Sequence, residues 1–461
     1  MTTRLLIIGG SDAGISAGLR AREPDPNCEV TVVVADRFPN YSICGLPFYL
    51  SGEVPDWHWL AHRTAEDITR EGIHLSLDTT AQAIVPANYL VTMLDEAGKT
   101  RQVPYDRLVI ATGAVPVRPR IPGIDLPGVY LLRSMQDSFA VHEYLDTHAP
   151  RSAVIVGGGY IGVEMADAFV HRGLPVTLVE HGASVLKTVD ESLGKLVSAE
   201  LRHHGVEVAT GVAVERIAQT GTQLRVMGSE GFSATADLVL VAVSVRPQTE
   251  LAEAAGIAIG ERQAICITRT METNVPDIYA AGDCVETWHR RLLQTPTYLP
   301  LGTTAHKQGR IAGENAVGGH REFAGTLGTQ VVKVFDVAVA RTGLRDAEAG
   351  KAGFEPLTVE STNWDHKVYY PGANPLHIRV TGDRKTGRLL GAQIVGQWQA
   401  EVAKRMDVFA TALFHGMRVD DLNDLDLSYT PPVSSPWDPI QMGAQAWLKA
   451  QGHTHGTILS D

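Results

Sequence analysis

Cys44 is the side chain in this sequence whose type and setting point most directly to chemistry. It lies in the segment Pro39–Pro47 (Pro-Asn-Tyr-Ser-Ile-Cys-Gly-Leu-Pro), and the positions five before and five after it hold Pro39 and Tyr49. A redox disulfide of the Cys-x-x-x-x-Cys type is therefore excluded. If a helix begins close to this cysteine, the unpaired amides and the dipole of that helix would stabilise the thiolate and lower the pKa of Cys44. We interpret Cys44 as a lone redox thiol.

Two glycine-rich turns lie on either side of Cys44 in sequence. The second follows an apolar strand at 153–156 and has the pattern Gly157-x-Gly159-x-x-Gly162, with a helix predicted from 163 to 172. These glycines let the backbone approach a pyrophosphate at a helix N-terminus. The next strand ends in Glu180, whose carboxylate can accept hydrogen bonds from ribose hydroxyls and would repel a 2′-phosphate. The pattern predicts an NADH site, and a protonated histidine directly after Glu180 would leave NADPH possible.

The first glycine turn follows a strand at 5–8 and departs from this pattern, because Ser11 stands where the middle glycine belongs. Two later segments, 111–113 and 273–283, strengthen the assignment. Together with the first turn they resemble those of a two-dinucleotide flavoprotein, which implies FAD at this unit and Asp283 on its ribityl chain. The candidate FAD-binding residues are Gly9, Ser11, Gly14, Asp36, Ala111, Thr112, Gly113, Gly282 and Asp283.

The two strand–turn–helix–strand units must sit in separate α/β domains, and a different pattern follows them. Proline-rich crossings near 115–123 and 244–247 make the second unit look inserted into the first. From about residue 328, strand-like runs at 331–335, 376–380 and 389–396 predict a third, α+β domain. We expect an FAD-binding domain at 1–117 and 245–327, an NAD-binding domain at 118–244, and an interface domain at 328–461.

Composition narrows the classes of function. The 461 residues carry a formal net charge of −12 without a basic run, which disfavours nucleic acid as a partner. The four cysteines are too sparse for a secreted disulfide framework, which favours a reducing compartment. No apolar stretch reaches the roughly 18 residues needed to cross a bilayer. We expect a cytoplasmic protein without a membrane partner and without a metal site.

The segment Ser42–Tyr49, together with both nucleotide units in this order, is similar to a known family. It resembles the single-cysteine branch of the pyridine nucleotide-disulfide oxidoreductases, which contains coenzyme A disulfide reductases, NADH oxidases and NADH peroxidases and has a glutathione reductase-like fold. The oxidases and peroxidases carry a histidine in the first glycine turn that assists a cysteine sulfenic acid, whereas this chain has Asp12 there. The resemblance is therefore strongest to the coenzyme A disulfide reductases.

That resemblance implies further site residues. Two tyrosines of the partner subunit would assist the chemistry, which points to Tyr429 and to Tyr369 or Tyr370, and it implies a homodimer with composite active sites. Tyr160, directly after Gly159, would cover the nicotinamide pocket. The residues implied for coenzyme A binding are Ser16, Arg20, Asn40, Ser42 and Arg63.

The function implied is NAD(P)H-dependent reduction of coenzyme A disulfide, or of a similar small disulfide or persulfide, through FAD and a mixed disulfide on Cys44. Three alternatives stay open. The first is an NADH oxidase or peroxidase in which Cys44 cycles through sulfenic acid. The second is a flavoprotein that passes electrons to a protein partner, with Cys44 incidental. The third is a catalytically silent NAD-binding sensor.

Overall fold

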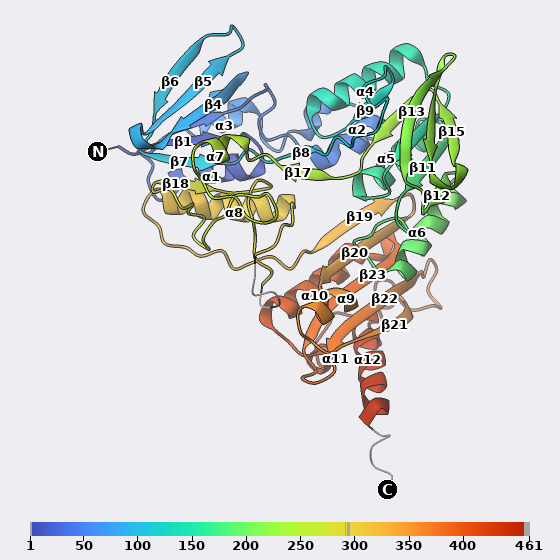
Figure 1. Ribbon diagram of the computed structural model, residues 1–461. Helices are drawn as coiled ribbons and strands as arrows, with labels where there is room; N and C mark the ends of the chain where they lie inside the picture. Colours follow the sequence, from blue (N-terminus) through green and yellow to red (C-terminus); the bar gives the residue numbers. More distant parts are fainter. Residues whose placement is uncertain (1, 291, 293–295, 456–461) are drawn as a thin grey trace.

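The first nucleotide-binding unit is built on a parallel sheet assembled from two distant stretches of chain. The computed structural model describes residues 2–290, 292 and 296–455. Its first sheet has five strands in the order β18-β7-β1-β2-β3 (Figure 1). The bounds are β1 (Arg4–Ile8), β2 (Glu29–Val33), β3 (Ile73–Ser76), β7 (Arg107–Ile110) and β18 (Ile278–Ala280). Residues 5–8 of β1 are all buried, as expected for a parallel strand covered on both faces.

Two helices from opposite ends of this unit cross in backbone contact. They are α1 (Asp12–Arg22) and α8 (Gly302–Ala316). A Cβ atom at Gly309 would overlap the carbonyl of Ala13, and one at Gly313 would overlap that of Ala17. The absent side chains therefore let α8 lie against α1 (Figure 1), and Gly302 at the start of α8 lies beside Asp12 at the start of α1.

The second unit repeats this architecture. Its parallel sheet has the order β12-β11-β10-β16-β9, covered by three helices. The strands are β9 (Val129–Leu131), β10 (Ala153–Val156), β11 (Val176–Glu180), β12 (Glu207–Thr210) and β16 (Leu238–Val241), and the helices are α4 (Met135–His148), α5 (Tyr160–His171) and α6 (Glu191–His203). The predicted βαβ units are confirmed, although α5 begins three residues earlier than the sequence suggested.

Small antiparallel sheets and short helices are attached to the two units, and one pair of strands connects them. The chain crosses between them through an antiparallel pair in which Val245 lies opposite Pro116. This pair consists of β8 (Ala114–Pro116) and β17 (Val245–Pro247). A three-stranded antiparallel sheet on the first unit contains β4 (Thr79–Val85), β5 (Leu90–Asp95) and β6 (Thr100–Pro104), and one on the second contains β13 (Val214–Thr220), β14 (Gln223–Gly228) and β15 (Ser233–Ala236). The short helices are α2 (Leu46–Ser51), α3 (Ala65–Arg70) and α7 (Glu250–Ala254). The domain boundaries near these crossings stay predictions.

The third domain is an antiparallel sheet packed against helices, at the lower end of Figure 1. Its strand order is β19-β20-β23-β22-β21, and the predicted α+β character is confirmed. The strands are β19 (Gln330–Val334), β20 (Val337–Gly343), β21 (Pro356–Trp364), β22 (Pro375–Asp383) and β23 (Leu389–Gln397), and the helices are α9 (Asp346–Lys351), α10 (Val402–His415), α11 (Val419–Asn423) and α12 (Pro439–His455). Trp447 of α12 is fully buried in its core.

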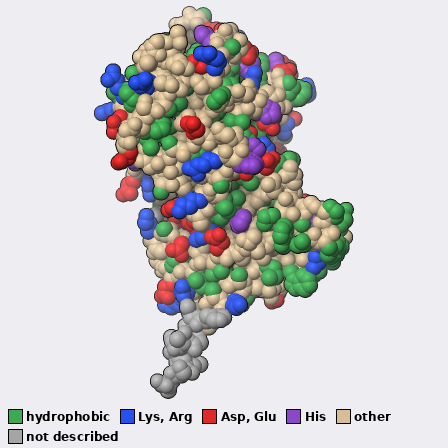
Figure 2. Space-filling view, turned by 90° about the vertical axis from the view of Figure 1, so that its right-hand side faces the viewer, with side chains coloured by type: hydrophobic (Ala, Val, Ile, Leu, Met, Phe, Trp, Pro, Cys, Tyr) green, Lys and Arg blue, Asp and Glu red, His purple; other side chains and the backbone are tan. Residues whose placement is uncertain are grey.

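The surface of the third domain carries many exposed apolar side chains. Figure 2 shows hydrophobic side chains gathered on the lower part of the molecule, which this domain forms. The large exposed ones are Val331, Trp364, Val368, Tyr369, Tyr370, Trp398, Phe414, Tyr429, Val433 and Trp437. Contiguous exposed apolar surface commonly marks a contact face for another protein. Among the described helices, none is long and apolar enough to cross a membrane.

Candidate functional site

Cys44 lies in a short 3₁₀ turn, Ile43–Gly45, that leads directly into α2. The turn is held by a hydrogen bond from the Ser42 amide to the Leu60 carbonyl (2.7 Å), and Gly45 leaves room for the Leu60 side chain, which a Cβ would meet at 2.6 Å. Cys44 is unpaired and exposed, whereas Cys28 and Cys284 are buried. Of the four thiols, Cys44 is therefore the one that a small molecule reaches most readily.

The electrostatic setting of Cys44 differs from the sequence-based expectation. Protein atoms crowd the thiol although the residue as a whole is exposed, and this desolvation raises its pKa above the ordinary value. The Glu164 carboxylate raises the pKa further, and only Arg133 opposes it. The lowered pKa predicted from a helix N-terminus is therefore wrong. The 3₁₀ turn and the six-residue α2 supply less stabilisation of a thiolate than burial and the nearby acids remove.

Glu164 and Arg133 are functional candidates that the sequence analysis missed. Burial raises the pKa of Glu164 to about 7, with a further contribution from Asp167. Glu164 follows Tyr160 by four residues on α5, so helical periodicity places both on one face, and this was the available signal. Arg133 pairs with Asp283 at 2.7 Å and so links the second nucleotide-binding unit to the first. No local pattern connects residues 150 positions apart.

We expect Glu164→Gln to lower the pKa of Cys44, because the substitution removes the carboxylate that raises this pKa most. The rate of iodoacetamide alkylation of the reduced protein, followed by intact mass across pH, should rise at a lower pH than in the unmodified protein. The difference in alkylation rate between Glu164→Gln and the unmodified protein should vanish well below pH 7, where Glu164 is itself protonated. Glu143→Gln, at an exposed position on α4, is the control. Unchanged profiles for both variants would remove Glu164 from the electrostatics of Cys44.

The first glycine turn forms a cradle that fits a dinucleotide. Gly9 has φ +115° and a Cβ there would overlap the Ala111 carbonyl, so only glycine fits. Ser11, at the middle position, has φ −93°, which any residue adopts, and the serine therefore leaves the turn intact. A cavity of about 370 Å³ adjoins the turn and is lined by Gly9, Val33 and Thr112 among others. Its size and glycine-bounded wall suit the adenosine end of FAD.

The other predicted FAD residues have contacts that bear on this role. Asp36 lies just beyond β2, where its Oδ1 accepts a hydrogen bond from the Phe38 amide at 2.9 Å. Thr112 donates its hydroxyl proton to the Gln248 carbonyl at 2.6 Å.

The remaining predicted FAD residues lie at the ends of neighbouring strands. Ala111 and Gly113 flank Thr112 at the end of β7, and Gly282 and Asp283 follow β18 next to β7. Gly14 packs so closely on the Gly9 carbonyl that no side chain fits. The sheet thus brings these distant segments to one edge.

The second glycine turn is also complete. Gly157 has φ +113° and meets the Ala242 carbonyl, and Gly162 packs on the Gly157 carbonyl. A Cβ at Gly159 would meet nothing within 4 Å, so the amide edge of this turn is open to a ligand. Tyr160 begins α5, is half-buried, and donates its hydroxyl proton to Gln330 Oε1 of the third domain. The turn is therefore shaped to receive a pyrophosphate, with Tyr160 at its side.

Glu180, at the end of β11, is buried and fully engaged. Burial alone would raise its pKa, but hydrogen bonds from Lys187 and from the amides of Gly182 and Gly158 outweigh burial and lower it. Lys187 Nζ lies 2.8 Å from Glu180 Oε1. The sequence-based preference for NADH treated Glu180 as an uncompensated negative charge. The structure corrects that premise, because Lys187 neutralises the carboxylate.

The predicted substrate-binding residues fall into two groups. Ser16 is buried and its hydroxyl lies 2.7 Å from His306 Nδ1, and Asn40 is buried with its amide 3.5 Å from Asp12. Arg20 forms an ion pair with Glu314 at 2.8 Å, which ties α1 to α8. Ser42 stands two residues before Cys44, and Arg63 is exposed. Arg20 thus has a structural partner already, while Ser16, Asn40 and Ser42 lie on the elements around the thiol.

The three predicted tyrosines lie on the third domain and are solvent-exposed. Tyr429 and Tyr369 lie close together, and the pKa of Tyr429 is raised by desolvation and by the interaction with the Tyr369 side chain. Tyr370 instead packs edge-on against His366, with ring centroids 5.9 Å apart. The three tyrosines and Cys44 belong to different domains, although β19 of the third domain packs beside α2, where Lys333 and Pro47 line one pocket. The geometry favours Tyr369 over Tyr370 as the companion of Tyr429.

A metal site was not expected from the sequence. Among the described residues, one group offers three ligand atoms close together, namely Glu200 of α6, His204 directly after this helix, and Asp336. His204 Nε2 lies 3.3 Å from Glu200 and 3.2 Å from Asp336, so the three side chains already contact one another.

Comparison with known proteins identifies the chain. Residues 3–309 match the family model of pyridine nucleotide-disulphide oxidoreductases, and residues 329–439 match the dimerisation domain of the same family. The chain belongs to this family. As a pyridine nucleotide-disulphide oxidoreductase it is an FAD- and NAD(P)H-dependent enzyme, and the third domain is a dimerisation domain. The resemblance inferred from Ser42–Tyr49 is confirmed.

Individual members of the family are similar over nearly their whole length. An NAD(P)H sulfur oxidoreductase (CoA-dependent) from Pyrococcus furiosus is 35% identical over 449 residues, which cover 95% of this chain and 97% of the relative. An NADH oxidase from Methanocaldococcus jannaschii is 32% identical over 97% of this chain and 99% of its own. The solved structure of an NAD-dependent persulfide reductase from A. fulgidus superimposes with a TM-score of 0.93 at 36% identity, over 98% of this chain and 84% of that one. The predicted α/β architecture is confirmed.

Proposed function

We propose that this oxidoreductase uses NAD(P)H to reduce coenzyme A disulfide, or a related small disulfide or persulfide, through a mixed disulfide on Cys44. One observation carries the proposal. Cys44 is an exposed, unpaired thiol whose pKa responds to groups from both nucleotide-binding units, including Glu164 and Asp283. A thiol placed between two nucleotide sites is suited to pass electrons from one ligand to an external sulfur compound.

The sulfur chemistry can be assigned to residues of this chain. FAD, when bound at the first glycine turn, supplies two-electron transfer between the nicotinamide and sulfur. Two electrons and one proton convert the mixed disulfide on Cys44 into a Cys44 thiolate and a free small thiol. The thiolate then attacks the next disulfide, re-forms the mixed disulfide and expels the second thiolate, which takes up a proton. Arg133, the cation that lowers the pKa of Cys44, would stabilise the thiolate between these steps.

The expelled thiolate needs a proton donor, and the Tyr369–Tyr429 pair is our candidate. The pair is exposed on the dimerisation domain. In a homodimer related by twofold symmetry, the pair of one subunit would reach the thiol of the other. Each active site would then be composite. Ser16, Asn40 and Ser42 would contact the substrate beside Cys44.

Intact mass spectrometry of the native protein, before and after dithiothreitol, tests the proposed chemistry. We expect an adduct of coenzyme A mass that dithiothreitol removes and that Cys44→Ser lacks. An adduct of another small thiol would retain the mechanism and replace the substrate. A cysteine that carries no adduct would contradict the mixed-disulfide mechanism.

NADH oxidation through a cysteine sulfenic acid is the second candidate, favoured by the similarity to the Methanocaldococcus jannaschii NADH oxidase. In that case the same spectra would show a singly oxygenated Cys44, which dimedone traps. Asp12 argues against it, because this carboxyl stands in the first glycine turn where the resemblance would place the histidine of the oxidases and peroxidases. The mass of the native Cys44 peptide distinguishes the two candidates.

A further inference from the structure

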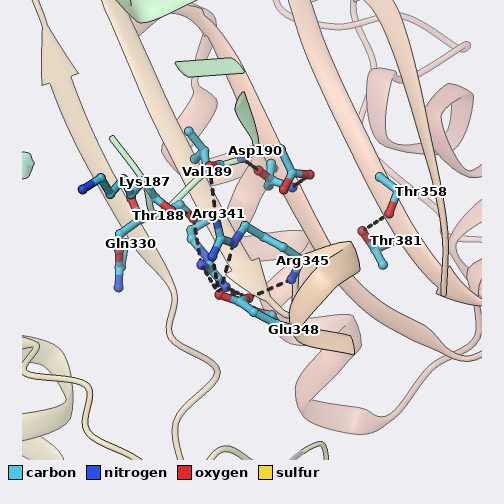
Figure 3. A network of polar contacts seen from close by, with 12 residues as sticks. Lys187, Thr188, Val189, Asp190, Gln330, Arg341, Arg345, Glu348, Thr358 and Thr381 are labelled. Carbon is cyan, nitrogen blue, oxygen red and sulfur yellow. Dashed lines mark hydrogen bonds and ion pairs between the residues drawn. The ribbon is translucent and has the colours of Figure 1, made fainter. Parts of the chain in front are cut away.

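Helix α6 of the second nucleotide-binding unit lies against the dimerisation domain and is held there at its beginning (Figure 1). Asp190, the residue before the helix, pairs with Arg379 of β22 at 3.0 Å. In the preceding loop, the carbonyls of Lys187 (2.6 Å) and Val189 (3.2 Å) accept hydrogen bonds from Arg345. Figure 3 shows this network of contacts between the two domains. Arginine side chains of the dimerisation domain therefore fix the start of α6.

At the other end of α6, three side chains that can bind a metal ion meet across the same domain boundary. Glu200 lies in the last turn of the helix, and His204 follows the helix directly. Because they are four residues apart, helical periodicity places them on one face. Asp336 lies opposite them, in the turn between β19 and β20. One oxygen from each carboxylate and one nitrogen of His204 all lie within 4.8 Å of one another.

The two carboxylates of this group lack a full counter-charge. Among the residues that the structure describes, no lysine or arginine forms an ion pair with Glu200 or Asp336. Their common partner is His204 Nε2, which carries at most one proton and therefore donates only one well-directed hydrogen bond. A divalent cation between the three side chains would neutralise both carboxylates and would also coordinate the imidazole nitrogen.

The spacing of the ligand atoms suits a tetrahedral zinc ion. Zinc binds imidazole nitrogen and carboxylate oxygen at about 2.0 to 2.2 Å, so two ligand atoms of such a tetrahedron lie about 3.3 to 3.6 Å apart. His204 Nε2 is 3.3 Å from Glu200 Oε1 and 3.2 Å from Asp336 Oδ2. These two separations are already close to tetrahedral values. The side chains therefore need to move little to bind the ion.

Contacts around the group hold its ligands in place. The imidazole of His204 stacks on the Phe335 ring, with centroids 4.1 Å apart and planes inclined by 3°. The Asp336 amide donates to Glu200 Oε1 at 3.1 Å, and the Asp336 carbonyl accepts a hydrogen bond from the Trp398 amide at 3.0 Å. Both sides of the domain boundary are thus ordered before an ion binds, which lowers the entropy cost of binding.

We propose that Glu200, His204 and Asp336 bind a zinc ion reversibly, and that the ion ties the end of α6 to the dimerisation domain. Three protein ligands leave the fourth tetrahedral position to water, unlike the closed four-ligand sites of structural zinc proteins. The Asp336 side chain is 58% exposed and that of Glu200 15% exposed, so the ion enters from solvent over Asp336. The ion takes no part in the disulfide chemistry proposed above.

Calorimetric titration of the holoenzyme with zinc chloride tests the site. The protein is first reduced, alkylated with iodoacetamide and freed of reductant, so that exposed thiols do not bind zinc. We expect one ion per chain and no comparable binding of magnesium, which prefers octahedral oxygen ligands. His204→Ala should weaken zinc by about 100-fold or more, because loss of an outer-shell partner alone commonly weakens metal binding by about 10- to 100-fold. His203→Ala, at the exposed neighbouring position, is the control and should bind zinc normally.

Asp336→Asn provides a second variant that keeps the backbone hydrogen bonds of the turn, in case His204→Ala does not fold. It should weaken zinc strongly as well. Zinc should also raise the thermal unfolding midpoint of the unmodified holoenzyme, since it binds the folded chain, and should leave that of Asp336→Asn nearly unchanged. Absence of zinc binding, or equal affinity in Asp336→Asn and the unmodified protein, would overturn the proposal. An equal loss in His203→Ala and His204→Ala would also contradict it.

Discussion

Cys44→Ser should lose NAD(P)H-dependent disulfide reduction by on the order of 10³-fold or more, while nucleotide still bleaches the yellow flavin at the normal rate. Removing a covalent nucleophile typically has an effect of this size, because a hydroxyl cannot form the mixed disulfide. Stopped-flow absorbance separates the two halves of the reaction, since flavin reduction precedes sulfur chemistry. Normal flavin reduction combined with lost disulfide reduction is the result expected for a thiol that acts after the nucleotide step.

Cys266→Ala is the matched control, because Cys266 is a partly exposed thiol of the same protein. It should leave both halves of the reaction intact. Full disulfide-reductase turnover by Cys44→Ser would make Cys44 incidental and would favour a flavoprotein that passes electrons to a protein partner. Loss of flavin reduction as well would indicate a structural defect around α2 rather than a missing nucleophile.

The second large effect is expected from the paired tyrosines. Tyr429→Phe should lower kcat for disulfide reduction by about 10²-fold, the lower end of what a positioned proton donor contributes. Tyr369→Phe should have a similar effect, because the interaction between the two neighbouring phenols orients the donor. Tyr370→Phe, which removes a hydroxyl from the neighbouring residue that packs on His366, should change kcat little.

A mixed dimer tests whether the tyrosines act across the subunit boundary. Cys44→Ser and Tyr429→Phe subunits, unfolded and reassembled together, should give dimers with one site that has both intact groups. We expect about half of the unmodified activity in the purified heterodimer. Activity no higher than that of the Tyr429→Phe homodimer would contradict the composite site. A large effect of Tyr370→Phe alone would reverse the choice between the two neighbours.

Much of the architecture is predictable because its signals are local. The apolar run at 5–8 and the turn at 9–14 specify a strand followed by a helix, and the same order recurs at 153–162. Gly9 and Gly157 have positive φ and touch carbonyls of neighbouring strands, so their identity is forced by the turn itself. Motif spacing therefore yielded both nucleotide units and the family without any knowledge of tertiary contacts.

The two incorrect expectations, for the pKa of Cys44 and for the charge at Glu180, concern properties that depend on contacts formed only in the folded chain. The pKa of Cys44 depends on Glu164 and Arg133, which the sequence places far from the cysteine. The charge at Glu180 depends on Lys187, seven residues away, and on a loop held by Arg345 of another domain. Local helix geometry predicted the wrong direction for Cys44, since it ignored desolvation. A motif reveals the presence of a charged group, but its environment sets the group's behaviour.

The sequence alone determined the lone thiol, the two dinucleotide turns and the order of the domains, because strand, turn and helix propensities are encoded in neighbouring residues. Only the tertiary structure decided which charges surround Cys44, that Tyr369 rather than Tyr370 pairs with Tyr429, and that Lys187 covers Glu180. Electrostatic interaction and desolvation act through space over a few ångströms. Such distances are fixed by how the sheets and helices pack.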